Sequence, residues 1–173
     1  PRPEFNLQST PLVVGGRLYS TGGARRAVAA LDAATGELIW MHSEREGARG
    51  EAAPRKLSGR GLAYWTDGTD ERILYVTTGY RLIALNAKSG KPVWSVLTVP
   101  KDDYRFISGP PRVFDGKVII GHGGADAANT RGYVTTYDAE TGKQLWRFFT
   151  VPGNPAIDKD ETTRLAAKTW KGE

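Results

Sequence analysis

One eleven-residue pattern recurs three times in this chain of 173 residues and constrains its fold more than any other feature. The copies align without gaps as ALDAATGELIW (30–40), ALNAKSGKPVW (84–94) and TYDAETGKQLW (136–146). Their closing tryptophans are 54 residues apart (40 to 94) and 52 residues apart (94 to 146). A long, nearly constant period indicates a repeat architecture, and this one lies near the upper end of the propeller repeats.

Each copy is typical of two short strands joined by a turn. An Asp or Asn at the start of the turn accepts hydrogen bonds from the amides that follow, and a glycine near its end can adopt a positive φ. We therefore expect a β-hairpin that ends on a tryptophan, and we expect the tryptophans to pack between neighbouring repeats. The turn residues are Asp32, Asn86 and Asp138 with Gly36, Gly90 and Gly142, and the tryptophans are Trp40, Trp94 and Trp146.

A second strand pair precedes each hairpin, at 11–21, 60–78 and 110–121. The last of these contains Asp115-Gly116, the strongest short-range signal for a tight hairpin. Each repeat therefore predicts four short antiparallel strands. No long stretch of the sequence spaces its apolar residues at the 3.6-residue period of a helix, so we expect little helix.

Four-stranded repeats arranged radially form a β-propeller, which typically has 4–8 blades. We predict an all-β partial propeller over 1–155, with about three four-stranded blades near 8–45, 58–98 and 106–150. Three blades cannot close a ring, and the sheet faces at both ends would stay uncovered. We expect a piece of a longer propeller, in which the polar segment 156–173 leads to the next blade.

The composition excludes several other classes of function. The chain lacks cysteine, so disulfides, thiolate zinc sites and cysteine nucleophiles are excluded. No apolar run approaches the roughly 20 residues of a membrane span. The net charge is +5, with basic residues spread among acidic ones, and this favours a solvated surface over nucleic-acid binding. An acidic protein partner stays open as an alternative.

The segment GHGGADAANTRGY (121–133) has the glycines of a phosphate-binding loop, but it does not meet that pattern. A third glycine is not at the required place, and the alternating RGYVTTYD that follows predicts a strand rather than a helix. We interpret it as a loop between two strands of one blade, with His122 inside the loop. His42 and His122 are too far apart in sequence to indicate a metal site by themselves.

The repeat A-x-D-A-x-T-G-x-x-x-W resembles the tryptophan-docking motif of quinoprotein dehydrogenases, which bind pyrroloquinoline quinone (PQQ). SGRGLAYW (58–65) looks like the strand-opening Arg-Gly segment of that family. Residues 116–153 are similar to its alcohol dehydrogenase branch, and residues 56–90 to its membrane-bound glucose dehydrogenase branch. The resemblance implies an eight-bladed periplasmic propeller with PQQ at its axis and Ca²⁺ beside it, in which an aspartate accepts the alcohol proton as hydride moves to PQQ.

The resemblance also implies roles for individual residues. Arg60 matches an arginine that contacts the quinone, and its guanidinium suits a planar, carboxylated cofactor. Ser108 lies where the family has a threonine hydroxyl on the cofactor, and Gln8 where it often has a glutamate. The alternatives are a surface arginine, a turn serine and a glutamine without a cofactor role.

The segment after His122 matches the family's axial loop. Gly123, Gly124 and Ala125 match small residues that let the backbone approach the quinone. Asp126 matches the family's glutamate ligand to Ca²⁺; aspartate is one methylene shorter, and its alternative role is to cap a turn. The family's paired cysteines before the arginine are missing here, and the loop after Asp126 is about one residue longer.

We predict no catalytic residue in this chain, because the family's catalytic aspartate lies in later blades. The leading hypothesis is a piece of a PQQ- and Ca²⁺-dependent dehydrogenase that oxidises alcohols or sugars and passes electrons to a cytochrome or ubiquinone. We expect it to be periplasmic, with or without membrane association, and to be inactive as an isolated fragment. The alternative is a non-enzymatic propeller that acts as a scaffold in outer-membrane assembly. A sugar-binding or nucleic-acid-binding propeller is a more distant third.

Overall fold

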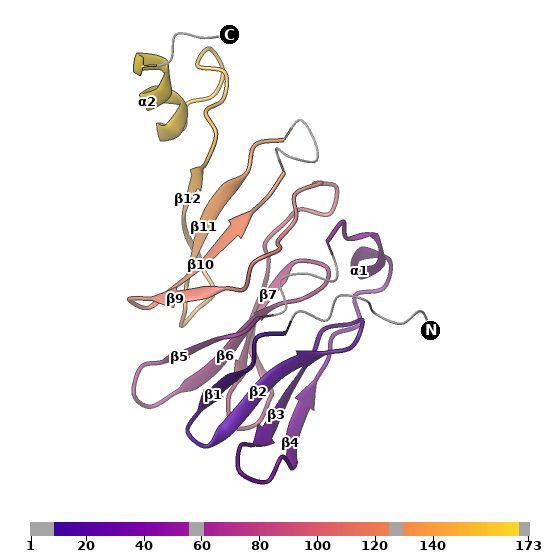
Figure 1. Ribbon diagram of the computed structural model, residues 1–173. Coiled ribbons are helices and arrows are strands. Elements are labelled where there is room, and N and C mark those ends of the chain that lie inside the picture. Colours follow the sequence, from indigo (N-terminus) through magenta and orange to yellow (C-terminus); the bar gives the residue numbers. More distant parts are fainter. Residues whose placement is uncertain (1–8, 56–60, 125–129, 170–173) are drawn as a thin grey trace.

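The computed structural model describes residues 9–55, 61–124 and 130–169. Within these ranges the backbone forms three four-stranded antiparallel sheets and two short helices (Figure 1). We call the sheets blade 1, blade 2 and blade 3 in chain order. The prediction of an all-β partial propeller is therefore confirmed. No helix in the described part of the chain is long and apolar enough to cross a membrane.

Each blade is a meander in which neighbouring strands in the sheet are also neighbours in sequence. Blade 1 contains β1 (Leu12–Val14), β2 (Arg17–Gly22), β3 (Ala27–Asp32) and β4 (Leu38–His42). Blade 2 contains β5 (Ala63–Thr66), β6 (Glu71–Val76), β7 (Arg81–Asn86) and β8 (Pro92–Leu97). Blade 3 contains β9 (Arg112–Phe114), β10 (Lys117–His122), β11 (Tyr133–Asp138) and β12 (Gln144–Phe149). The helices are α1 (Ala48–Ala52) and α2 (Glu161–Thr169).

The turn chemistry expected from the repeat is present in all three blades. In blade 1, Asp32 Oδ1 accepts hydrogen bonds from the amides of Ala34 and Thr35, both at 2.8 Å, and Gly36 has φ of 76°. Asn86 and Asp138 accept equivalent bonds in blades 2 and 3. These bonds join residues only two or three positions apart, so the sequence of each repeat favours the same turn independently of the other blades.

The blades pack face to face, and blade 2 lies between the other two. Ile73, Tyr75, Ile83 and Leu85 point to blade 1, while the residues that alternate with them on β6 and β7 point to blade 3. Both strands are therefore buried on both faces, which explains their nearly continuous apolar sequences.

The tryptophans of blades 1 and 2 pack on the following blade, as predicted. Trp40 Nε1 donates to the Ala87 carbonyl at 3.0 Å, and Trp94 Nε1 donates to the Ala139 carbonyl at 3.1 Å. Each indole also lies against the turn glycine of the next repeat: a Cβ would lie 2.5 Å from the Trp40 ring at Gly90, and 2.7 Å from the Trp94 ring at Gly142. The repeated glycines thus provide both a positive φ and the space for the neighbouring indole. Trp146, by contrast, is 45% exposed.

Two buried arginines, which the sequence analysis did not anticipate, also join the blades. Arg26 is fully buried, and its Nη1 donates to the carbonyls of Val76 and Thr77 in blade 2 at 2.6 and 3.1 Å. Arg72 donates to the Ala139 carbonyl of blade 3 at 3.0 Å, and its guanidinium lies 4.6 Å from the Trp65 ring centroid. Burial of their charges is tolerated because backbone carbonyls of the adjacent blade accept hydrogen bonds from their guanidinium groups.

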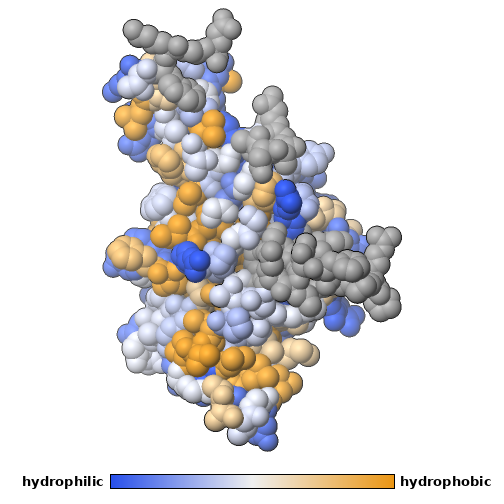
Figure 2. Space-filling view, viewed as in Figure 1, coloured by the Kyte–Doolittle hydropathy of each residue, from blue (hydrophilic) through white to orange (hydrophobic). Residues whose placement is uncertain are grey.

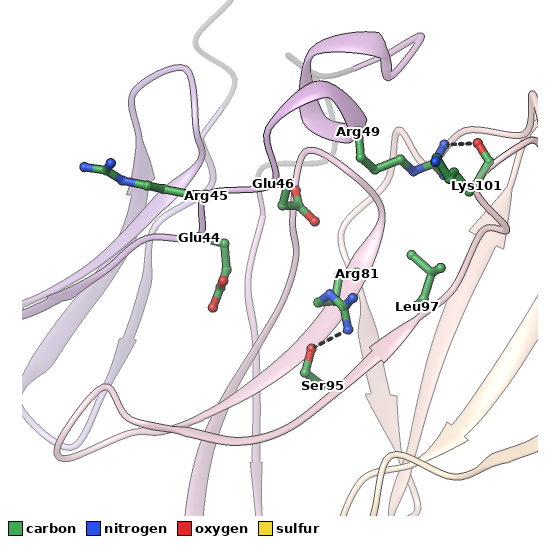
Figure 3. A pocket seen from close by; sticks show the side chains of 8 residues that line it. All are labelled: Glu44, Arg45, Glu46, Arg49, Arg81, Ser95, Leu97 and Lys101. Atoms are coloured by element: carbon green, nitrogen blue, oxygen red, sulfur yellow. Dashed lines mark hydrogen bonds between the residues drawn. The ribbon is translucent and has the colours of Figure 1, made fainter.

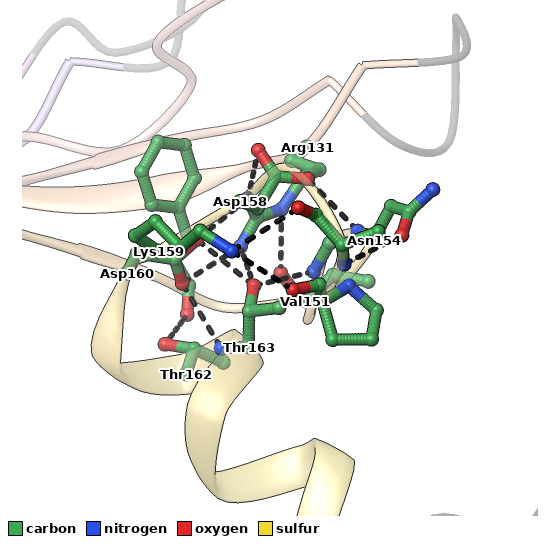
Figure 4. Close-up of polar contacts among 12 residues, drawn as sticks. Arg131, Val151, Asn154, Asp158, Lys159, Asp160, Thr162 and Thr163 are labelled. Atoms are coloured by element: carbon green, nitrogen blue, oxygen red, sulfur yellow. Dashed lines mark hydrogen bonds and ion pairs between the residues drawn. The ribbon is translucent and has the colours of Figure 1, made fainter.

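Helix α2, which the sequence analysis did not predict, is attached to blade 3 through Arg131 (Figure 4). The Arg131 guanidinium makes two parallel contacts with Asp160, of 2.9 and 3.0 Å, and lies 4.1 Å from the Phe149 ring centroid. Asp160 also accepts the Thr163 amide at 3.0 Å, so it caps the helix N-terminus. Arg131, and to a smaller extent Thr163, hold the pKa of Asp160 well below its ordinary value.

Two substitutions of Asp160 should separate the ion pair from the helix cap. Asp160→Asn keeps a capping oxygen but loses the charge, whereas Asp160→Ala loses both and should cost α2 about 1 kcal/mol more. Because folding lowers this pKa, the ion pair stabilises the wild type above the ordinary aspartate pKa, and the stabilisation is lost as the pH falls through the folded value. Hydrogen exchange of the α2 amides measures both effects. Equal exchange in Asp160→Ala and the wild type would contradict this role.

Candidate cofactor site

The described candidate residues Ser108, Gly123 and Gly124 belong to connections that leave the blades at one end. In each meander the second and third strands are joined at this end, and the chain also passes to the next blade here (Figure 1). The Asx-Gly turns lie at the opposite end. The strands that begin blades 2 and 3, β5 and β9, contact each other. The two blades therefore come together along the edges formed by these strands. Segments far apart in sequence can therefore meet at this edge.

Contacts between glycines and their neighbours bring three of the predicted segments together. Gly61, which directly follows Arg60, packs on Pro110: a Cβ on Gly61 would lie 2.6 Å from Pro110 Cβ. Pro110 belongs to the connection between blades 2 and 3, which also contains Ser108 and Phe106. Phe106 forms an antiparallel bridge with Gly123. The amide of Gly123 donates to the Phe106 carbonyl at 2.9 Å, and the reverse bond is 3.2 Å. The segment that begins at Gly61, the Ser108 segment and Gly123-Gly124 are thus neighbours.

The individual positions differ in what they offer to a ligand. Ser108 is exposed, Gly123 is half-buried and Gly124 is buried. A Cβ on Gly123 would lie 2.6 Å from the Phe106 ring, so internal packing already requires a glycine there. A Cβ on Gly124 would lie 3.1 Å from the Thr130 carbonyl oxygen, a tight contact. The remaining predicted site residues, Gln8, Arg60, Ala125 and Asp126, lie outside the described residues.

The axial loop is anchored on both sides of residues 125–129. On one side is the bridge between Phe106 and Gly123. On the other, Arg105 Nε donates to the Arg131 carbonyl at 2.7 Å, while Arg105 Nη1 pairs with Asp103 at 2.6 Å. The backbone at Gly123 and at Arg131 is therefore held beside the Ser108 segment. The sequence analysis missed Arg105, whose partners become apparent only in the folded chain.

His122 is the last residue of β10 and is buried, so the expectation of a loop histidine is wrong. Its ring stacks beside that of Tyr133, with 4.4 Å between centroids. Arg147 lies 4.0 Å from the Tyr133 ring centroid on the same face of blade 3. Burial, followed by the positive charge of Arg147, lowers the pKa of His122 to about 3. The imidazole is therefore neutral at physiological pH, and it supports the strand from which the axial loop leaves.

We expect this histidine to make the fold acid-sensitive. The unfolded chain takes up a proton at His122 near pH 6.5, whereas the folded chain does so only near pH 3. Between these values the free energy of unfolding should fall with decreasing pH, by at most about 1.4 kcal/mol per pH unit from this group. Urea denaturation from pH 7 to 4 should show a shallower slope in His122→Gln than in the wild type. Identical slopes would contradict the assignment.

The rim between blades 1 and 2 carries a cleft of about 510 Å³ (Figure 3). The carboxylates at this cleft are already engaged: Glu44 pairs with His42 at 3.0 Å, and Glu46 accepts the Thr77 hydroxyl at 2.6 Å. The described candidate residues Ser108, Gly123 and Gly124 do not line it. Its described lining consists of Glu44, Arg45, Glu46, Arg49, Arg81, Ser95, Leu97 and Lys101.

The described residues do not provide a cluster of His, Cys, Asp or Glu side chains for a metal ion. They contain no group of three or more His, Cys, Asp or Glu side chains that could hold an ion. The candidate ligand Asp126 lies outside the described residues. Any Ca²⁺ site near the axial loop would therefore need Asp126 together with ligands from beyond the described part of this chain.

Comparison with known proteins agrees with the fold. The family model described as "PQQ: Glucose/ethanol/alcohol dehydrogenase, beta-propeller domain" matches residues 1–172. The quinohemoprotein alcohol dehydrogenase ADH-IIG of Pseudomonas putida is 44% identical over 172 residues, which are 96% of this chain and 23% of that protein. The dehydrogenase subunit of the quinone alcohol dehydrogenase of Gluconobacter oxydans is 45% identical, over 94% of this chain and 22% of that protein.

Solved structures agree with these relatives. That of ADH-IIG from Pseudomonas putida has a TM-score of 0.79 at 43% identity and covers 95% of this chain and 24% of that one. That of quinohemoprotein alcohol dehydrogenase from Comamonas testosteroni has a TM-score of 0.76 at 40% identity, over 95% of this chain and 25% of that one. The chain belongs to the PQQ β-propeller family of glucose, ethanol and alcohol dehydrogenases. It spans about a quarter of the length of the relatives it matches.

Proposed function

We propose that the protein containing this chain is a dehydrogenase that oxidises alcohols with PQQ and Ca²⁺ and passes the electrons to a cytochrome or ubiquinone. The observation that carries the proposal is the convergence of the Ser108 segment, Gly123-Gly124 and the segment that begins at Gly61 at one end of a propeller of this family. The printed names of the relatives, which include quinohemoprotein and quinone alcohol dehydrogenases, support an alcohol substrate. Sugars are a second substrate class, supported by the glucose dehydrogenases in the family description.

In this proposal the chain provides one wall of the cofactor site. The guanidinium of Arg60 and the exposed hydroxyl of Ser108 would hold the acidic, planar quinone through hydrogen bonds. Gly123, Gly124, Ala125 and Gln8 would complete this wall. Asp126 would supply a hard oxygen ligand to Ca²⁺. When bound, PQQ supplies the two-electron chemistry, while this chain binds and orients it.

Dye reduction by the whole protein tests the proposed activity. The protein is reconstituted with PQQ and Ca²⁺ and supplied with an artificial electron acceptor and a panel of primary alcohols and aldoses. We expect dye reduction that depends on alcohol, PQQ and Ca²⁺ together. The isolated 173 residues should give none, because the catalytic aspartate is expected in other blades. An inactive reconstituted protein across the whole panel would overturn the proposal and favour a non-enzymatic propeller.

Asp126 should determine the Ca²⁺ requirement of the whole protein. Asp126→Ala should raise the Ca²⁺ concentration for half-maximal reconstitution by about tenfold or more, whereas Asp126→Glu should stay near the wild type because it keeps a carboxylate. The matched control is Asp115→Ala, an exposed aspartate in a turn at the opposite end of blade 3. An unchanged Ca²⁺ requirement in Asp126→Ala would leave the aspartate with only the role of capping a turn.

A further inference from the structure

One arginine, Arg105, contacts both ends of the connection that joins β10 to β11. Its Nε donates a hydrogen bond to the Arg131 carbonyl at 2.7 Å, at the end that leads into β11. At the end that leaves β10, a Cβ added to Gly124 would lie 3.4 Å from Arg105 Cγ. The same Cβ would lie 3.1 Å from the Thr130 carbonyl oxygen, so the two ends also contact each other. The aliphatic stem and the guanidinium of Arg105 therefore contact opposite ends of one connection.

Asp103 fixes the orientation of Arg105. One carboxylate oxygen of Asp103 accepts a hydrogen bond from Arg105 Nη1 at 2.6 Å, and the other accepts the Arg105 amide at 2.9 Å. The two side chains are only 19% and 14% exposed, and the guanidinium lies 4.9 Å from the Tyr133 ring centroid. A planar guanidinium can donate from Nε and Nη1 to two acceptors at once, which a lysine ammonium cannot do in the same geometry.

The segment that carries Arg105 also carries Ser108, and the backbone between them is fixed by the core. Phe106 and Ile107 are 5% and 0% exposed and belong to the core cluster shared by blades 2 and 3. The Phe106 backbone exchanges two hydrogen bonds with Gly123. Ser108, the next residue, is exposed. The position of the Ser108 hydroxyl is therefore linked to the backbone that Arg105 contacts.

We propose that Arg105 is a positioning residue for the quinone: it sets the place of the Gly123-Gly124 backbone relative to the Ser108 hydroxyl, and Asp103 acts through it. The inference rests on the proposed function, which assigns Ser108 and Gly124 to the cofactor site. Arg105 Nε and Nη1 already donate to protein acceptors, which favours a positioning role over direct contact with the quinone. Binding groups must be held closely in place by their supporting contacts, so a small displacement of this backbone lowers affinity.

Hydrogen exchange in the whole protein, purified without PQQ, tests the positioning itself. Arg105→Met keeps an aliphatic stem but loses both donors, so we expect the Gly123 amide to exchange about tenfold faster or more. The matched control is Arg147→Met, because Arg147 lies 4.0 Å from the same Tyr133 ring centroid but comes from β12. In both variants the amides of β6 and β7 should exchange as in the wild type, which excludes a general loss of stability.

The whole protein is used because this chain is about a quarter of the length of its relatives and has large apolar side chains at its surface (Figure 2). Other parts of the protein can cover these side chains. The contacts of Arg105 are independent of that covering, since all its partners named above lie within this chain.

Quenching of tryptophan fluorescence by added PQQ, at saturating Ca²⁺, tests the effect on the cofactor. Arg105→Met should raise the PQQ concentration for half-saturation by about tenfold or more, the usual effect of removing a supporting contact. Arg105→Lys should be intermediate, because it keeps the charge but not the planar pair of donors. Asp103→Asn should weaken PQQ binding in the wild type and add nothing in Arg105→Met, because it acts through Arg105. Arg147→Met should bind PQQ like the wild type.

Two results would overturn the inference: a Gly123 amide that exchanges equally in Arg105→Met and the wild type, or equal PQQ affinity in these two proteins. Arg105→Lys takes the place of Arg105→Met in both measurements if circular dichroism shows that the latter unfolds. A wild type that binds no PQQ would instead contradict the proposed function, while the exchange of the Gly123 amide would still decide whether Arg105 holds this backbone.

Discussion

Trp40→Ala is expected to lower the free energy of unfolding by about 3–5 kcal/mol, the usual cost of removing a buried tryptophan. The indole is 9% exposed, fills the space over Gly90 and donates to the Ala87 carbonyl. Its loss leaves a cavity between blades 1 and 2 and an unpaired carbonyl. Urea denaturation, at concentrations where the chain is monomeric, measures the loss.

The chain contains its own matched control for this substitution. Trp146→Ala removes the same side chain from the same position of the repeat, but that indole covers no following blade within the described chain and is 45% exposed. In the isolated 173-residue chain we expect a loss of about 1 kcal/mol or less, because surface positions contribute little to stability. Equal losses in the two variants would show that docking on the next blade does not stabilise the fold.

Arg26→Ala is expected to cost about 3 kcal/mol or more. The fully buried guanidinium donates to the carbonyls of Val76 and Thr77, and an unpaired buried acceptor costs about 1–3 kcal/mol. Arg26→Met keeps much of the apolar stem and separates the packing contribution from the lost hydrogen bonds. Chemical denaturation of both variants gives the two parts.

The neighbouring residue provides the control for Arg26. Arg25 is exposed, so Arg25→Ala should leave the free energy of unfolding within about 0.5 kcal/mol of the wild type. A similar loss in Arg25→Ala and Arg26→Ala would point to a general effect of charge. It would contradict a specific contact between blades 1 and 2.

The sequence was sufficient to predict the blades because the repeated signals are local. The Asx residue, the glycine and the tryptophan of each copy lie within eleven residues, so one hairpin explains all three. The glycines could be assigned to turns without knowledge of neighbouring blades. Their second role, to make room for Trp40 and Trp94, became visible only when adjacent blades were packed together.

The long-range polar contacts could not be predicted in the same way. Arg26 and its acceptors at Val76 and Thr77 are about 50 residues apart in sequence. Nothing in the local sequence distinguishes Arg26 from Arg25, because burial depends on a partner from another blade. His122 illustrates the same limit: the glycines after it suggest a loop, but pairing with Tyr133 extends β10 through it.

The candidate site was predicted in part. The resemblance identified the segments around Ser108 and Gly124, and the structure brings these segments together with the one that begins at Gly61. It also adds a packing reason for Gly123 that the resemblance did not contain, since the Phe106 ring occupies the space of a side chain. The roles of Arg60 and Asp126 remain predictions.

A crystal structure of the whole protein with PQQ and Ca²⁺ tests the central claim most directly. We predict that the quinone lies against the backbone at Gly124, with the Arg60 guanidinium and the Ser108 hydroxyl on its polar groups and an Asp126 oxygen on the ion. A quinone bound elsewhere, with Arg60, Ser108 and Gly124 all out of contact, would contradict the claim that this chain forms a wall of the cofactor site.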